Sequence, residues 1–129
     1  MNEIQLLWVH SSQMTPGTVV KNHAHDYFHL IDVTAGQMRF FLGEEEMLLR
    51  AGDMVLVHRG KNHRFSNESD QLVCFREVKF IAHGQLLPRL MQSIDAQVIR
   101  DSFARQLMAQ LAAEFTQNRA LKEEAAQAV

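Results

Sequence analysis

Short apolar and β-branched segments, separated at close intervals by turn residues, make up the first 82 residues of the chain. Glycine-containing turns recur around positions 16–17, 36, 43, 51–53 and 60, and such turns mark strand ends. Closely spaced short strands favour a β-sandwich or barrel over alternating strands and helices. The expected strands are 4–10, 18–33 with a break around 26–27, 38–42, 46–50, 54–57, 63–65 and 71–81.

The pattern becomes helical after residue 82. Apolar residues recur there at the three- and four-residue spacing of an amphipathic helix, and Asp101 and Ser102 are candidate N-caps for a second helix. We therefore expect a β-barrel over 1–82 and two helices within 83–129, together one structural domain. The helices either pack on the barrel or form a dimer interface. The candidate dimer seam consists of Phe103, Leu107, Leu111 and Phe115.

Composition excludes several classes of protein. A formal net charge of −2 over 129 residues offers no basic surface of the kind that follows a nucleic acid backbone. The single cysteine, Cys74, cannot form an internal disulfide, and its spacing from Leu72, Val78 and Phe80 predicts a buried structural thiol. No apolar run reaches the length of a membrane span, and no signal peptide is evident. We expect a cytoplasmic protein without a membrane partner.

Histidines are the chemically informative residues. His23, His25 and His29 are separated by even steps, which in one extended strand would place their side chains on one face. His63 lies in a second stretch, 52–67, together with His58. Imidazoles gathered on one face can ligate a transition metal or hydrogen-bond an organic ligand.

These two stretches resemble the two signature motifs of the cupin superfamily. They read Gly17-x5-His23-x-His25-x3-His29-x6-Gly36 and Gly52-x5-His58-x-Gly60-x2-His63-x3-Asn67. The cupin pattern has Glu at position 29 and Pro at position 58, and the sequence matches it at every other signature position. The resemblance implies a mainly β fold, a jelly-roll barrel (double-stranded β-helix), followed here by the two predicted helices.

The resemblance also implies a set of site residues. In metal-bearing cupins His23, His25 and His63 would be ligands, and His29 stands where the family has its carboxylate ligand. The implied cofactor is one divalent transition metal, Zn, Ni, Fe or Cu. Many cupins have lost their metal, and the histidines would then contact an organic ligand. We identify no catalytic acid or base, and the candidate pocket residues are Tyr27, Arg39, Phe41, His58 and Phe65.

A compact cupin, then a strand such as 75–80, then two helices resembles the effector-binding half of AraC-type transcription regulators. This resemblance implies a small-molecule effector and a homodimer. DNA would be contacted only through a helix-turn-helix domain that is absent from this chain. The leading hypothesis is a ligand-sensing domain of such a regulator. The alternatives are a stand-alone metal-dependent cupin enzyme, of dioxygenase or lyase type, and a metal-free binding module.

Overall fold

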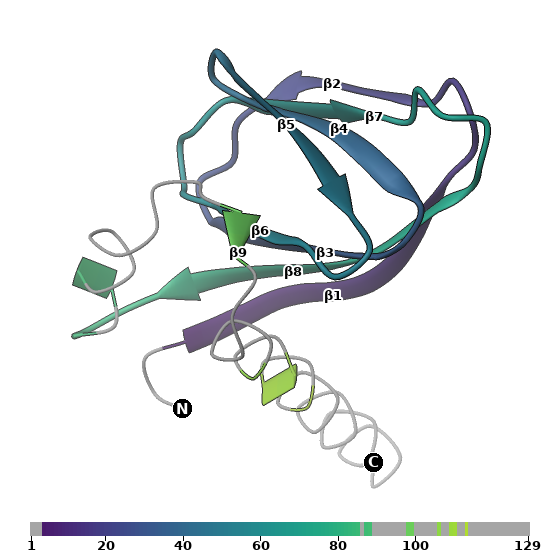
Figure 1. The fold of residues 1–129 in the computed structure, drawn as a ribbon. Helices are drawn as coiled ribbons and strands as arrows, with labels where there is room; N and C mark the ends of the chain where they lie inside the picture. Colours follow the sequence, from purple (N-terminus) through teal and green to yellow (C-terminus); the bar gives the residue numbers. More distant parts are fainter. Residues whose placement is uncertain are drawn as a thin grey trace, which may run out of the picture.

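Two antiparallel sheets face one another in the computed structural model (Figure 1). The model describes residues 4–85, 87–88, 98–99, 106, 109–110 and 113. The first sheet has the order β1 (Ile4–Met14), β8 (Val73–Ala82), β3 (Phe28–Ala35), β6 (Met54–Val57) and β9 (Val98–Ile99). The second has the order β2 (Val19–His23), β7 (His63–Ser66), β4 (Gln37–Leu42) and β5 (Glu45–Arg50). The mainly β prediction is confirmed.

Most predicted strands are present with small changes in their bounds. The break within 18–33 separates β2 from β3, and the predicted hairpin is β4 and β5. Strand β1 extends to Met14 because its polar residues pair along β8, whereas the sequence predicted an end at residue 10. Strand β9, which pairs with β6, was not predicted. The two predicted C-terminal helices and their candidate seam fall almost entirely outside the described residues.

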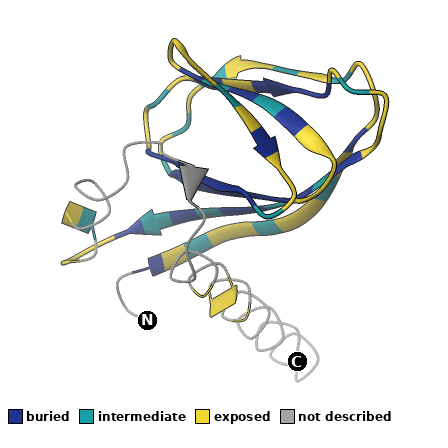
Figure 2. Cartoon of the chain, in the orientation of Figure 1, coloured by how far each residue is buried: buried dark blue, intermediate teal, exposed yellow. Residues whose placement is uncertain are grey.

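The barrel has two hydrophobic cores, on opposite faces of the first sheet. One lies between the sheets and includes Ile31, Phe40 and Phe65. The other covers the outer face of the first sheet and includes Leu30 and Phe80. Strand β3 is consequently buried on both faces from its first residue to Val33 (Figure 2).

The two cores explain why the predicted burial of β8 was wrong in its first half. Val73 and Phe75 belong to the core between the sheets, whereas Val78 belongs to the outer core. The buried face of the strand therefore changes along its length. As a result Leu72 is 42% exposed and Cys74 is only partly buried.

Several motif residues hold the barrel together. The Asn67 amide donates to the carbonyls of Met14 and Gln71, and its oxygen accepts from the backbone and hydroxyl of Ser69. The fully buried Asn67 therefore joins the end of β1 to the loop before β8. Gly36 has φ +77, and a Cβ there would lie 2.6 Å from the carbonyl oxygen of Leu72, so only glycine fits without a shift.

Candidate functional site

Three histidines meet at the end of the barrel where β2 ends and β7 begins. His23 is the last residue of β2 and pairs with His63, the first residue of β7, while His25 lies in the loop that follows β2. The ligand atoms of these three residues all lie within 4.8 Å of one another. The amide of Gly60 donates to the carbonyl of His25 at 2.6 Å and so ties this loop to the turn before β7. We call these residues the three-histidine cluster.

The expectation that His23, His25 and His29 lie on one face of a single strand was wrong. His23 and His29 do not share one strand, because β2 belongs to one sheet and β3 to the other. The chain crosses between the sheets at residues 24–27, and the histidines approach from both sides of the barrel. His29 lies just outside the cluster, with its ring centroid 5.7 Å from that of His63 and 5.9 Å from that of His25.

Backbone contacts select the tautomers of two cluster residues. Nδ1 of His23 lies 2.6 Å from the carbonyl oxygen of Lys21, and Nδ1 of His63 lies 3.0 Å from that of Lys61. Since a carbonyl only accepts, each Nδ1 carries the hydrogen and each Nε2 keeps its lone pair. Nε2 of His63 is buried and has no hydrogen-bond partner among the described residues. A buried, unpartnered lone pair is what a metal ligand needs.

Burial and crowding keep His25 and His63 neutral. Burial, together with the neighbouring His23 and His29, lowers the pKa of His25 to about 4. Burial likewise lowers the pKa of His63 to about 4, against the backbone hydrogen bond to Lys61 that favours its charged form. At neutral pH both imidazoles are therefore in the form that binds metals.

His29 has a carboxylate partner that the sequence reasoning missed. Its Nε2 lies 3.0 Å from Oε1 of Glu77, and the other carboxylate oxygen of Glu77 accepts from the Ser12 hydroxyl at 3.1 Å. Burial lowers the pKa of His29 despite this contact. Burial alone would raise the pKa of Glu77, but the hydrogen bond from His29 and the contacts with Ser12 and Lys79 lower it. The pair is therefore a neutral imidazole donating to a carboxylate.

This contact determines which nitrogen of His29 is available. Because Nε2–H donates to Glu77, Nδ1 keeps its lone pair, and Nδ1 is buried without a hydrogen-bond partner in the described part of the chain. The only sequence signal for Glu77 was its charge within a strand predicted to be buried.

The candidate pocket residues divide among the cluster, the two cores and the outer face of the second sheet. Tyr27 lies at the cluster, where its ring stacks on His25 with centroids 4.6 Å apart. Phe65 belongs to the core between the sheets and stacks on Phe40. His58 is buried against Phe28 of the outer core, with ring centroids 5.6 Å apart, on the other side of the first sheet from the histidines.

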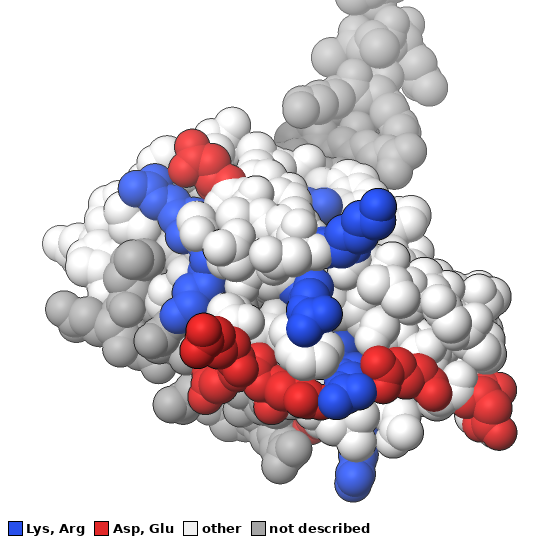
Figure 3. All heavy atoms as spheres, turned by 90° about the horizontal axis from the view of Figure 1, so that it is seen from above, with Lys and Arg blue, Asp and Glu red and all other residues white. Residues whose placement is uncertain are grey.

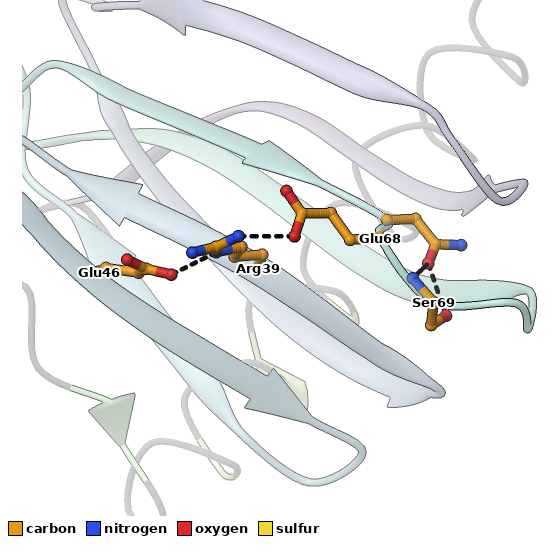
Figure 4. Close-up of polar contacts among 5 residues, drawn as sticks. Arg39, Glu46, Glu68 and Ser69 are labelled. Atoms are coloured by element: carbon orange, nitrogen blue, oxygen red, sulfur yellow. Dashed lines mark hydrogen bonds and ion pairs between the residues drawn. The ribbon is translucent and has the colours of Figure 1, made fainter.

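Arg39 and Phe41 lie on the outer face of the second sheet, because the residues between and beside them on β4 point inward. Arg39 forms ion pairs with Glu46 and Glu68 (Figure 4) and lines an open surface groove of about 560 Å³. The structure does not bring these two residues to the cluster. Seen from above, this part of the surface carries Lys and Arg beside Asp and Glu rather than one continuous basic patch (Figure 3).

The cluster fits a transition metal by the chemistry of its donors. Three neutral imidazoles are a common donor set for zinc and for other first-row metals. Tetrahedral ligands at 2.0–2.1 Å from zinc lie roughly 3.4 Å apart, so the three rings would need to close by at most about 1.4 Å. His23, His25 and His63 would hold the metal, and Nδ1 of His29 is a further donor close by.

No described helix is long and apolar enough to cross a membrane.

This fold and these motif contacts define a cupin barrel. Three solved structures illustrate the likeness. A predicted oxalate decarboxylase from Thermotoga maritima is 22% identical, with a TM-score of 0.56 over 60% of this chain and 67% of that one. A cupin protein from Bacteroides fragilis is 18% identical, with a TM-score of 0.54 over 66% and 70%. The cupin domain of Cnp3 from Schizosaccharomyces pombe is 12% identical, with a TM-score of 0.55 over 67% and 63%.

These identities establish the fold alone. A family model gives the finer assignment, because the AraC-like ligand binding domain matches residues 8–129. The chain belongs to the family of AraC-like ligand-binding domains. A comparison with curated proteins found no match.

Proposed function

We propose that this AraC-like domain is the effector-sensing part of a transcription regulator and holds a divalent transition metal at His23, His25 and His63. The three-histidine cluster carries the proposal, because its ligand atoms lie within 4.8 Å of one another and backbone contacts at two Nδ1 atoms leave the Nε2 lone pairs of His23 and His63 available. A bound metal would act as a Lewis acid and coordinate oxygen atoms of the effector. The effector would bind at the same end of the barrel.

Metal content tests the first half of this proposal. We would measure it by mass spectrometry of the metals in protein purified without an affinity tag. The wild type and a His83→Ala control, altered at an exposed histidine outside the cluster, should carry close to one metal per chain. His23→Ala and His63→Ala should lose most of it. Wild-type protein from metal-replete cells that carries no metal would contradict the metal site.

The regulator role requires that the domain change its assembly when it binds an effector. The homodimer proposal rests on the helical pattern of residues 103–115. The full chain, fused to a DNA-binding module that recognises its operator only as a dimer, should repress a reporter. Replacing Leu107 and Leu111 with Asp should abolish repression while the fusion stays soluble. A fusion that is monomeric and silent without these changes would contradict the dimer.

A metal-dependent enzyme is a second candidate, favoured by one observation. A set of three histidines leaves a coordination position open, as catalytic metal sites do. Oxygen uptake and product formation would be measured for the metal-loaded protein with small carboxylic acids, oxalate included. Turnover that His63→Ala abolishes would support an enzyme. Absence of turnover with tight binding of the same acids would support the sensor.

A further inference from the structure

The ammonium group of Lys79 lies near the three-histidine cluster and over the Trp8 ring. Lys79, on β8, pairs in register with Trp8 on one side and His29 on the other. Its Nζ lies 4.4 Å from the Trp8 ring centroid and 5.8 Å from that of Tyr27. Together with Leu7 these residues line a shallow depression of about 360 Å³. Among the described residues Lys79 forms no hydrogen bond or ion pair, whereas Arg76, three residues earlier, is paired with Asp32.

Tyr27 contacts both the depression and the cluster. It lines the depression, and its ring is nearly parallel to that of His25, at an interplanar angle of 6°. The positive charge of Lys79 lies close enough to disfavour protonation of His25 and His29. The depression therefore adjoins the three-histidine cluster.

Lys79 has no carboxylate partner in the described part of the structure. The buried Glu77 already accepts from His29 and Ser12, and the exposed Asp26 forms no ion pair with Lys79 within that part. An anionic ligand would provide acceptors for the hydrogen-bond donors of Lys79. A divalent metal on the cluster would add two positive charges and so strengthen the attraction for such a ligand.

We infer that the depression binds a small carboxylate-bearing molecule with a flat ring, its carboxylate on Lys79 and its ring against Trp8 and Tyr27. This assignment rests on the proposed effector-binding role and names the chemical class of the effector. Trp8 is 37% exposed although His10 stacks on its ring, so a ligand ring placed on its remaining exposed surface removes apolar surface from water.

The test compares acids with their neutral amides. Isothermal titration calorimetry would measure benzoate, salicylate and phenylacetate against benzamide, salicylamide and phenylacetamide. The proteins would be the wild type, Lys79→Met, Lys79→Arg and the control Arg50→Met, which removes an exposed positive charge of β5. At least one acid should bind the wild type more tightly than its amide. Lys79→Met should weaken that acid by about 10- to 100-fold, the range for one charge-assisted hydrogen bond, and its amide by less than about threefold.

The conservative variant and the control sharpen the outcome. Lys79→Arg should restore most of the preference for the acid, and Arg50→Met should leave it unchanged. The inference is overturned if no acid binds better than its amide, if Lys79→Met keeps the preference, or if Arg50→Met loses it too. Metal content, measured on the same preparations, separates the two proposals. Metal without acid binding refutes the ligand class alone, and Lys79-dependent acid binding without metal refutes the metal site alone.

Discussion

Replacing Glu77 tests how much its hydrogen bond with His29 contributes to the stability of the protein. Its carboxylate is 10% exposed and accepts at 3.0 Å from Nε2 of His29, which is 2% exposed. A hydrogen bond to a charged group contributes about 1.5–3 kcal/mol. Glu77→Leu should therefore lower the free energy of unfolding of the metal-free protein by about 1.5–3 kcal/mol. Glu77→Gln keeps a neutral acceptor for His29 and should cost about 1 kcal/mol.

Urea denaturation followed by circular dichroism would measure these differences. Glu46→Gln is the matched control, because Glu46 is 46% exposed and pairs with Arg39 at the surface. Exposed pairs contribute less than about 1 kcal/mol. A double-mutant cycle with His29→Leu isolates the contact, and we expect a coupling free energy of about 1.5–3 kcal/mol. A coupling below about 0.5 kcal/mol, or a Glu77→Leu variant as stable as the wild type, would refute the reasoning.

The same substitution has a spectroscopic consequence. In the wild type, nitrogen-15 shifts should show that His29 carries its hydrogen on Nε2, because the Glu77 carboxylate can only accept. Glu77→Leu removes the acceptor and should produce a mixture of tautomers. An unchanged tautomer in this variant would show that something other than Glu77 selects it.

Three further predictions concern the frame of the site. Gly36→Ala should destabilise the fold by about 2 kcal/mol or more, because Gly36 has φ +77 and the new Cβ would meet the Leu72 carbonyl. Gly43→Ala is the control, and it should cost about 1 kcal/mol because no atom lies within 4 Å of the new Cβ. Asn67→Ala removes four side-chain hydrogen bonds and should cost about 2–4 kcal/mol in urea denaturation. The metal-free protein should lose stability as the pH falls from 6.5 to 4, since unfolded His63 takes up its proton near pH 6.5 and folded His63 only at about 4. This histidine alone should account for about 3 kcal/mol of that loss, and a His63→Gln variant should show a correspondingly flatter pH profile.

The strands could be predicted from sequence because each turn carries its own chemical signal. Gly43 and Gly52 both have positive φ and both were expected to end strands. The second core could not be predicted in the same way. Strand β3 alternates its side chains between two buried faces, and an unbroken apolar run does not show what lies on its outer face. The burial of β8 was misjudged for the same reason.

The resemblance to the cupin motifs implied that His23, His25 and His63 would meet, although the even-step argument placed the first two on the same strand as His29. The pairing of His23 with His63 depends on β2 lying beside β7, which is a property of the whole sheet. For Arg39 the strand was predicted correctly but the face of the side chain was not. That face depends on the register of β4 with β5 and β7, and no local sequence signal gave the register.

The departure from the cupin pattern at position 29 changes where the negative charge of the site lies. The family has a carboxylate ligand there, whereas this chain has His29 and supplies Glu77 from the adjacent strand β8. The negative charge therefore lies behind the imidazole and not among the cluster nitrogens. A metal held by the proposed imidazole ligands would keep its full charge, and Lys79 would add another positive charge nearby. His29 at this position and Lys79, which has no carboxylate partner among the described residues, would thus have the same consequence, since both would raise the preference of this end of the barrel for an anionic ligand.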